Sequence, residues 1–353
     1  MMKKLPLLIF LASFSLFAQQ SYYNDVDLTK SGTALRDELA TKIINTHTKV
    51  LSYGWEADQA TDVDPNDASK VFLIYGWEDG SDSDCTNDLK RGINDNGGSS
   101  CDWNREHVYP KSLGTPSFSN NTTPGADGHH IRASDVQRNN SRGNLLFTNG
   151  SGNSKSVSGG WYPGDEWCGD VARIIMYMYL RYGNQCLPKN VGTGATNSVD
   201  SNMMNLFLEW NAADPVSATE DQRNNYLENS SNTYGQGNRN PFIDNPNLAT
   251  QIWGGPTAEN RWATASTEEN VLLSSIAIFP NPSTTRSINI RTPNSSLSII
   301  NITLYSVIGK KVFSTNKPVF DNNLLTIESL NSGIYLLKIS SKNSSTTKKI
   351  IIQ

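Results

Sequence analysis

Beyond its N-terminus the chain has no long hydrophobic segment. The one extended apolar stretch, Leu5–Phe17, is shorter than the roughly 20 residues that a membrane-spanning helix needs. Lys3 and Lys4 precede this stretch and Ala18 follows it, which is the pattern of a secretory signal peptide. We therefore predict a signal peptide over residues 1–18 and an exported mature chain without a transmembrane segment.

Cysteine is scarce, with four residues in 353. No two of them have the Cys-x-x-Cys spacing of many zinc sites, although a zinc site remains the alternative. An even number of cysteines in an exported protein favours disulfides. Four cysteines allow three pairings, of which Cys85–Cys101 and Cys168–Cys186 close short local loops and are the pairs we expect.

Most of the chain lacks an excess of basic residues. Residues 19–275 contain 19 Lys and Arg against 32 Asp and Glu, whereas residues 276–353 contain 9 against 2. Proteins that bind nucleic acid are usually basic on the contact face, so the acidity of the larger part argues against such a partner unless positive charge is concentrated locally. The acidic stretches Asp62–Asp67 and Asp79–Asp88 predict a solvated acidic face, with bound Ca²⁺ as the alternative.

One stretch, residues 105–142, is locally basic. Its acids are only Glu106, Asp127 and Asp135, and they are outnumbered by its basic residues, which are Arg105, Lys111, Arg132, Arg138 and Arg142. A positive cleft on an acidic body would reconcile this composition with an anionic substrate.

The sequence of the larger part of the chain predicts an α+β domain that is mostly helical. Apolar residues recur at helical spacing over 34–53 and 165–183, and further helices are expected over 201–210 and from about 218. Residues 71–75 form a short apolar run typical of a strand, and residues 82–100 are rich in the residues of loops. We place this domain at 21–253 and a polar linker at 254–275.

The C-terminal part, residues 276–353, has a different character. It consists of short β-prone runs separated by turns, which predict a small all-β sandwich; the runs are 288–290, 300–305, 311–313, 324–327, 333–339 and 348–352. It contains no histidine and no cysteine, and its acids are Asp321 and Glu328. We therefore do not expect catalysis there.

Three motifs in this part occur in a characteristic order. Phe-Pro-Asn-Pro-Ser at 279–283 is followed by Leu-Tyr-Ser-Val-Ile-Gly-Lys-Lys-Val at 304–312 and by Leu-Asn-Ser-Gly-Ile-Tyr-Leu-Leu-Lys at 330–338. Residues 276–353 thus resemble the C-terminal sorting domain of type IX secretion cargo. The resemblance implies that the type IX secretion machinery is a partner and that the protein is secreted or associated with the cell surface. A carbohydrate-binding or adhesive module is the alternative.

Catalytic residue types gather in the basic stretch. Three of only four histidines fall within residues 107–130, beside a carboxylate, several amides and several arginines. Hydrolysis of a phosphodiester needs these parts: a base with a pKa near neutrality to deprotonate water, oxygen ligands for a cation, and guanidinium groups for phosphate. Few oxygen ligands suit Mg²⁺, which retains several of its waters.

The order of these residues resembles a known family. Asn104-Arg105-Glu106-His107-Val108-Tyr109-Pro110 is followed by Asp-x-His-x-Ile at 127–131 and by Asn-x-x-Arg-x-Asn at 139–144. This pattern is similar to that of the bacterial extracellular and periplasmic endonuclease I family, a branch of the ββα-metal (His-Me finger) nucleases. The resemblance extends over residues 30–253.

The resemblance implies a role for each residue. His107 would be the general base, and Glu106 and Asn139 would hold one Mg²⁺, with Mn²⁺ or Ca²⁺ as alternative metals. Asn140 and Asn144 are alternatives to Asn139 as the amide ligand, and the alternative for Glu106 is an ion pair with Arg105. Arg142 would either support catalysis by contacting phosphate or steady the loop. Other arginines of the basic stretch are expected to bind substrate, namely Arg105, Arg132 and Arg138.

The remaining residues of these motifs are expected to be structural. His129 would brace the hairpin, and Asp127 and Asn144 would support the site. His130 is expected at the surface.

The predicted function is a secreted, monomeric endonuclease that cuts DNA without sequence specificity, with RNA as a further substrate, and leaves 5′-phosphate ends. One alternative is an extracellular ribonuclease. The other is a non-catalytic surface-binding protein with a degenerate nuclease domain; the presence of Glu106, His107 and Asn139 argues against it.

Overall fold

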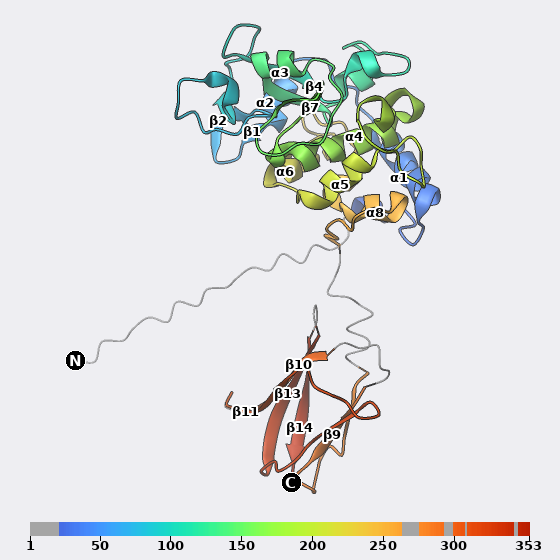
Figure 1. The fold of residues 1–353 in the computed structure, drawn as a ribbon, viewed down its shortest axis with the longest axis vertical. Helices are drawn as coiled ribbons and strands as arrows, with labels where there is room; N and C mark the ends of the chain where they lie inside the picture. Colours follow the sequence, from blue (N-terminus) through green and yellow to red (C-terminus); the bar gives the residue numbers. More distant parts are fainter. Residues whose placement is uncertain (1–20, 263–274, 293–298, 308, 342–344) are drawn as a thin grey trace, which may run out of the picture. The chain divides into compact units, whose positions relative to one another are not determined.

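The computed structural model describes residues 21–262, 275–292, 299–341 except 308, and 345–353. The predicted signal peptide and residues 263–274 of the predicted linker lie outside these ranges. The described residues divide into two compact units, 21–262 and 275–353 (Figure 1). In the described part of the chain, no helix combines the length and the hydropathy that crossing a bilayer requires.

A long buried helix organises the larger unit. The helix α4 (Cys168–Tyr182) has nearly all its side chains buried from Cys168 to Leu180, and it packs against α1 (Gly32–Thr46) and α5 (Asn205–Ala213). The sequence predicted α4 closely, with a turn of 3-10 helix at Asp165–Trp167 before it. The helix predicted over 34–53 instead ends at Thr46, because the backbone N–H groups of Thr48 and Lys49 donate to the Gln236 carbonyl oxygen.

Shorter helices complete the packing around α4. The helix α6 begins where the sequence predicted, with a capping box in which Ser217 and Glu220 each accept from the other's backbone N–H. Packing continues past the predicted domain end at residue 253, since the Trp262 ring lies 5.1 Å from that of Tyr23. The shorter helices have these bounds: α2 Glu56–Thr61, α3 Val136–Arg142, α6 Ala218–Glu228, α7 Pro241–Asp244 and α8 Asn247–Trp253.

The sheets of the larger unit are small and antiparallel. The strands β1 (Val63–Asp64), β2 (Asp67–Phe72) and β3 (Lys90–Gly92) form one sheet. A second pair consists of β4 (Trp103–His107) and β5 (Ile131–Asp135), and α3 follows β5 without a connecting loop. A third pair consists of β6 and β7, at Lys155–Val157 and Gly160–Tyr162.

The predicted acidic face around Asp62–Asp67 is wrong for two of its three acids, Asp62 and Asp64. Asp62 is fully buried and accepts from Arg132 Nε at 2.8 Å and from Arg223 Nη1 at 2.6 Å. Asp64 is also buried and is paired with Lys90. Burial of a carboxylate is tolerated here because each has a cationic partner.

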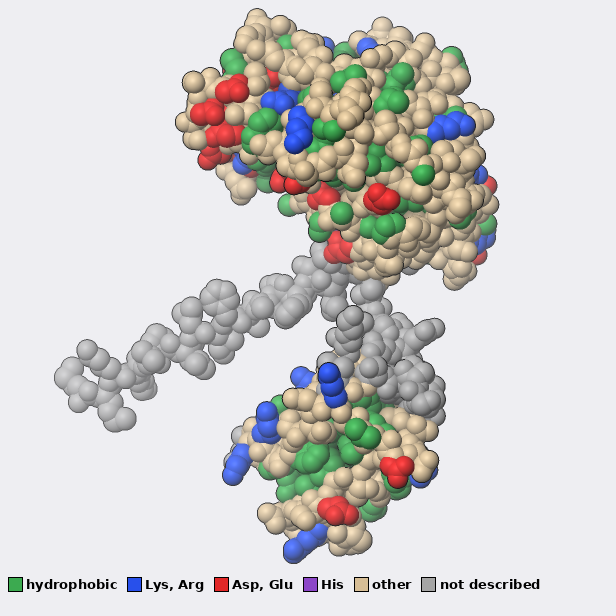
Figure 2. All heavy atoms as spheres, viewed as in Figure 1, with side chains coloured by type: hydrophobic (Ala, Val, Ile, Leu, Met, Phe, Trp, Pro, Cys, Tyr) green, Lys and Arg blue, Asp and Glu red, His purple; other side chains and the backbone are tan. Residues whose placement is uncertain are grey.

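The exposed acids lie elsewhere in the larger unit. Asp79, Asp82 and Asp84, in the segment between β2 and β3, are exposed. Figure 2 shows acidic side chains gathered over part of the visible face of this unit. The prediction of a solvated acidic face therefore holds for this segment.

One of the two predicted disulfides is present in the structure. Cys85 and Cys101 form a disulfide, as expected. The expected bond between Cys168 and Cys186 is absent, since both are free and buried. Cys168 begins α4 and Cys186 follows its end, so a helix of 15 residues, about 22 Å long, separates them. Their Cα atoms are thus far beyond the roughly 7 Å that a disulfide can bridge.

The C-terminal unit is all-β, as predicted. A four-stranded antiparallel sheet has the order β11-β10-β13-β14 and a three-stranded sheet has the order β12-β9-β8. Isoleucine and leucine side chains from both sheets form one hydrophobic core, which is the arrangement of a sandwich. The bounds are β8 Ala277–Phe279, β9 Ile288–Arg291, β10 Ile299–Ser306, β11 Lys311–Asn316, β12 Leu324–Ile327, β13 Gly333–Ser341 and β14 Ser345–Ile352.

Candidate active site

A cavity of about 650 Å³ lies where β4 ends beside α3. The structure brings Glu106, His107 and Asn139 together in its lining, although Asn139 is more than 30 residues from the other two. The other lining residues are Tyr53, Arg105, Pro110, Lys111, Ser112, Ser117, Phe118, Arg142, Gly143 and Asn144. This lining contains several cationic side chains and a single carboxylate.

The pairing of β4 with β5 places these residues. Glu106 pairs with Arg132 and His107 with Ile131 in the antiparallel register. At the end of β5, the side chain of Asp135 accepts from the N–H groups of Gln137 and Arg138 and so caps α3. One turn into α3, Asn139 Nδ2 donates to Asn104 Oδ1 on β4 at 2.6 Å. The helix is therefore tied to the strand that carries the histidine.

The ring of His107 is held on several sides. Its Nε2 lies 2.9 Å from the carbonyl oxygen of Gly125, which can only accept, so Nε2 carries the hydrogen and Nδ1 has the free lone pair. Burial, His130, Lys111 and Arg105 lower the pKa of His107 to about 2, against the opposing effect of the Gly125 carbonyl. The imidazole is thus a neutral base at physiological pH.

His130 is not at the surface as predicted. It is fully buried, its Nε2 donates to the Pro124 carbonyl oxygen at 2.6 Å, and its ring lies 5.3 Å from that of His107. Burial lowers the pKa of His130 to about 4, so it is neutral. It packs against the ring of His107 and does not line the cavity.

Glu106 is buried, and several groups of the protein contact its carboxylate. Its Oε1 accepts from the Tyr75 hydroxyl at 2.9 Å and lies 3.3 Å from Arg142 Nη1. The backbone N–H of His107 also donates to the Glu106 carboxylate. Burial raises the pKa of Glu106, while Arg142, the Tyr75 hydroxyl and the His107 backbone N–H oppose that shift. A nearby cation would favour the ionised form.

Asn139 provides a second oxygen at the cavity. Because its Nδ2 donates to Asn104, its Oδ1 is directed away from that bond, and no donor to it occurs in the described part of the chain. The carboxylate of Glu106 and the amide oxygen of Asn139 are hard oxygen donors of the kind that Mg²⁺ prefers. Two protein ligands fit a cation that keeps most of its waters, so this donor set suits the implied metal.

Arg142 steadies the loop, which is one of its two expected roles. Its Nη2 donates to the Val108 carbonyl oxygen at 2.7 Å, and its Nη1 donates to the carbonyl oxygens of Gly143 and His107. Its side chain is 1% exposed. These bonds fix the backbone just after the general base.

Of the three arginines expected to bind substrate, one lines the cavity and two do not. Arg105 lines the cavity. Arg132 is buried between Asp62 and Asp170, so the prediction that it contacts substrate is wrong. Arg138 does not line the cavity, because its Nε and Nη1 donate to the carbonyl oxygens of Thr86 and Ser154. The charges of these two arginines support the fold.

Among the expected structural residues, Asp127 and His129 do not line the cavity, whereas Asn144 does. Asp127 is buried and accepts from the hydroxyls of Tyr177 and Tyr182 at 2.8 and 2.7 Å. His129 is buried, and its Nε2 donates to the Asn238 carbonyl oxygen. Asn144 lines the cavity, where its Nδ2 donates to Ser112 Oγ. The first two tie the segment before β5 to α4 and to the segment before α7.

Sequence reasoning missed Tyr53. Its ring is stacked on that of His107, with centroids 5.0 Å apart and an interplanar angle of 25°. It comes from the segment between α1 and α2, far from the other site residues in sequence. The chain offers no local signal for this contact, since one tyrosine before a short helix is unremarkable.

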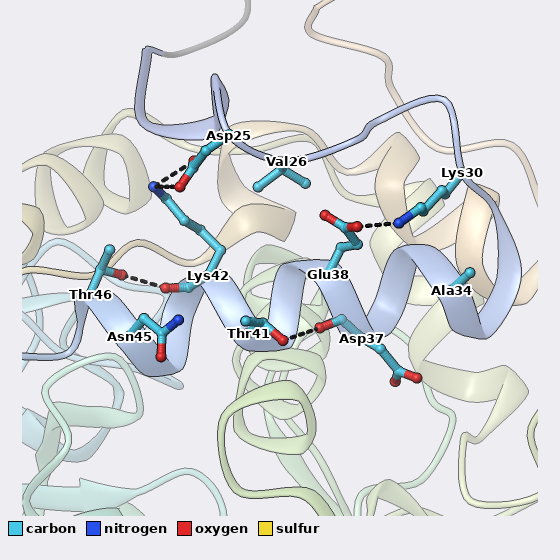
Figure 3. A pocket seen from close by; sticks show the side chains of 10 residues that line it. All are labelled: Asp25, Val26, Lys30, Ala34, Asp37, Glu38, Thr41, Lys42, Asn45 and Thr46. Carbon is cyan, nitrogen blue, oxygen red and sulfur yellow. Dashed lines mark hydrogen bonds and ion pairs between the residues drawn. The ribbon is translucent and has the colours of Figure 1, made fainter.

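A second hollow, of about 490 Å³, lies along α1 (Figure 3). Four of its charged side chains form two ion pairs: Lys42 binds Asp25, and Lys30 binds Glu38. No histidine or cysteine lines it. It therefore lacks the imidazole base that the cavity beside β4 contains.

A neutral imidazole, a buried carboxylate and an amide oxygen beside cationic side chains define a site suited to hydrolysing anionic esters. The comparison with known families is consistent with that class. Residues 31–247 match the sequence pattern of the Endonuclease I family, and the chain belongs to this family. It is therefore a nuclease.

The C-terminal unit matches a second protein family. Residues 277–353 match the secretion system C-terminal sorting domain. The resemblance of these residues to type IX secretion cargo is thereby confirmed. The protein is secreted or associated with the cell surface.

Two known proteins are similar over most of the chain. The extracellular ribonuclease of Bacillus amyloliquefaciens is 40% identical over 246 residues, which cover 66% of this chain and 78% of that protein. The extracellular ribonuclease of Bacillus subtilis (strain 168) is 39% identical over 257 residues, which cover 68% of this chain and 83% of that protein. The similarity supports a secreted nuclease.

Proposed function

We propose that this protein is a secreted endonuclease that hydrolyses both DNA and RNA without sequence specificity, with His107 as general base and one Mg²⁺ held by Glu106 and Asn139. The observation that carries the proposal is the fixed imidazole of His107: its Nε2 is bound to a carbonyl oxygen and its Nδ1 is free, in a cavity that Glu106 and Asn139 also line.

The reaction follows from these groups. Nδ1 of His107 takes a proton from a water molecule, whose oxygen bonds to phosphorus as the bond from phosphorus to the 3′ oxygen breaks. The leaving oxygen takes a proton from solvent, so the products are a 3′-hydroxyl and a 5′-phosphate. A bound Mg²⁺ would offset the negative charge on the phosphate and on the leaving oxygen.

A hydrolytic route does not require the 2′-hydroxyl of RNA. The alternative, internal attack by that hydroxyl, commonly needs an acid and a base on opposite sides of the phosphate. His107 is the one histidine that lines the cavity, and His129 and His130 are buried with low pKa values. We therefore expect activity on both sugars, and the names of the two ribonucleases support RNA as one substrate.

We assign β4, β5 and α3 as a ββα-metal core. The histidine and the carboxylate end the first strand, the second strand pairs with it, and the helix that follows directly contributes Asn139. This order places the base and both proposed ligands on two tied elements. The C-terminal unit, in turn, is proposed to engage the type IX secretion machinery, and we expect the enzyme to act as a monomer.

The test is cleavage by the mature chain of supercoiled plasmid, single-stranded DNA and an RNA of matched sequence, with Mg²⁺, Mn²⁺, Ca²⁺ or EDTA. We expect metal-dependent cleavage of all three substrates, loss of at least 10³-fold in kcat for His107→Ala, and 5′-phosphate ends. Glu106→Gln and Asn139→Ala should raise the concentration of metal needed for half-maximal rate.

The outcomes separate the alternatives. Cleavage of RNA alone, with cyclic phosphate ends, would make the protein a ribonuclease that attacks through the 2′-hydroxyl. Full activity of His107→Ala would overturn the assignment of the base. A folded wild type that binds nucleic acid without cutting it would indicate a surface-binding protein.

A further inference from the structure

Four side chains form a continuous stack beside the cavity. The guanidinium carbon of Arg105 lies 3.8 Å from the centroid of the Trp55 ring and 3.9 Å from that of Tyr53. The Tyr53 ring is stacked in turn on His107. The stack therefore runs from Trp55 through Arg105 and Tyr53 to the general base, and it joins the segment before α2 to β4.

Arg105 is bound to this stack rather than to a carboxylate. Most arginines of the larger unit form ion pairs, but in the described residues Arg105 has none. Its Nη1 donates to the backbone oxygen of Tyr53 at 2.8 Å, and its Nε is buried without a partner. A planar guanidinium stacks well between two rings, whereas a lysine ammonium would not fill that space.

The stack restrains the tilt of the His107 ring, which its hydrogen bond to Gly125 does not prevent. The bond from Nε2 to the Gly125 oxygen fixes one edge of the ring but allows the ring to tilt about that bond. Tyr53 lies nearly parallel to the imidazole at 25°, and His130 packs at 58°. Together these rings define the plane of the imidazole and hence the direction of Nδ1.

We propose that Tyr53 is a positioning residue for His107 and that Arg105, clamped between Tyr53 and Trp55, holds Tyr53 in place. The proposal rests on the proposed function, in which His107 is the general base. Tyr53 acts through the imidazole and not on the substrate. Its removal therefore lowers kcat, because small misplacements of a reacting group cost up to about 100-fold in rate.

The experiment compares Tyr53→Leu with Tyr53→Phe on one short single-stranded oligonucleotide. Tyr53→Phe keeps the stacked ring and should keep kcat within about twofold of the wild type. Tyr53→Leu should lower kcat by about 10- to 100-fold and change KM by less than about threefold. A rise in KM with unchanged kcat would instead make Tyr53 a substrate-stacking residue and would overturn the proposal, as would equal losses in both variants.

A double-mutant cycle tests the clamp. Arg105→Lys keeps the charge but loses the planar stack, so it should lower kcat in the same direction as Tyr53→Leu. The combined variant should be no slower than the slower single variant, because both changes release the same ring. Multiplicative losses would show that Arg105 acts separately, and this would overturn the clamp. Arg105→Lys also provides the test should Tyr53→Leu not fold.

A measurement that does not depend on activity keeps this proposal distinct from the proposed function. The four histidines give few imidazole signals in nitrogen-15 NMR spectra, and His107→Ala identifies those of His107. We expect one sharp set with the hydrogen on Nε2 in the wild type and in Tyr53→Phe, and broadened or shifted signals in Arg105→Lys. Unchanged signals in Arg105→Lys would overturn the clamp even if the protein is an active nuclease. A wild type that does not cut nucleic acid would overturn the proposed function alone.

Discussion

The Nε2 of His107 lies 2.9 Å from the carbonyl oxygen of Gly125, so a backbone carbonyl determines which nitrogen of the proposed base is free. Gly125 itself is crowded. A Cβ built on it would lie 1.8 Å from the carbonyl oxygen of Ser119. The loop that orients the base therefore has no room for a side chain at this position.

We expect Gly125→Ala to impair catalysis and to destabilise the fold. The added methyl group must displace backbone, which costs on the order of 1–3 kcal/mol of unfolding free energy. The displaced carbonyl would also release the imidazole of His107, so kcat should fall by at least about 10-fold. Thermal unfolding and steady-state kinetics measure the two effects.

Gly98→Ala is the matched control for that substitution. A Cβ at Gly98 meets nothing within 4 Å, so this variant should retain the kcat and the melting temperature of the wild type. If Gly125→Ala behaved like Gly98→Ala, the carbonyl of Gly125 would not be what orients His107.

The sequence predicted the centre of the site better than its surroundings. Glu106, His107 and Asn139 form ordered motifs, and the structure places all three at one cavity. The contact between Tyr53 and His107 joins segments far apart in the chain, so no local pattern reveals it. The burial of Arg132 was missed for the same reason, since its partner Asp62 lies 70 residues earlier.

The fold shows the same division between local and tertiary effects. The strands of the C-terminal unit follow alternating β-prone runs, and α6 follows a capping box, so both could be predicted from neighbouring residues. The early end of α1 depends on a bond to Gln236, which belongs to a distant segment. Likewise, the separation of Cys168 from Cys186 depends on the length of α4 and not on their spacing in sequence.

Asp62→Asn should destabilise the larger unit strongly. Asp62 is fully buried, and its two oxygens accept from Arg132, Arg223 and the Ala133 N–H. The amide leaves two buried guanidinium groups without their shared negative charge, which costs about 3–5 kcal/mol. Urea unfolding measures the loss, and Asp25→Asn, at an exposed ion pair with Lys42, should unfold like the wild type. Equal stability of both variants would contradict a structural role for the buried network.

Reduction should weaken the larger unit through a single disulfide. Cys85 and Cys101 are separated by 16 residues, and a loop of that size corresponds to roughly 3 kcal/mol. Cys85→Ser with Cys101→Ser should lose about this much and should no longer respond to reductant. In denaturant without reductant, the wild type should expose two reactive thiols, those of Cys168 and Cys186. No reactive thiols would mean that the second bond does form.

Acid should destabilise the larger unit partly through His129. Burial lowers the pKa of His129 from 6.5 to about 4, so between these pH values the unfolded chain binds the extra proton and the folded chain does not. The stability that neutral His129 contributes is fully present above pH 6.5 and is lost as the pH falls toward 4, by roughly 3 kcal/mol.

Other buried groups titrate as well, so the informative quantity is the difference between the wild type and His129→Gln. Burial raises the pKa of Asp58 and of Asp170, and these carboxyls favour the folded state as the pH falls, which offsets the histidines in the total. Glutamine does not titrate, and the carboxyls are common to both proteins. The wild type should therefore be more stable than His129→Gln by a margin that narrows by roughly 3 kcal/mol between pH 7 and pH 4, measured by urea unfolding at each pH. A margin independent of pH would mean that His129 binds its proton as readily in the folded protein as in the unfolded chain.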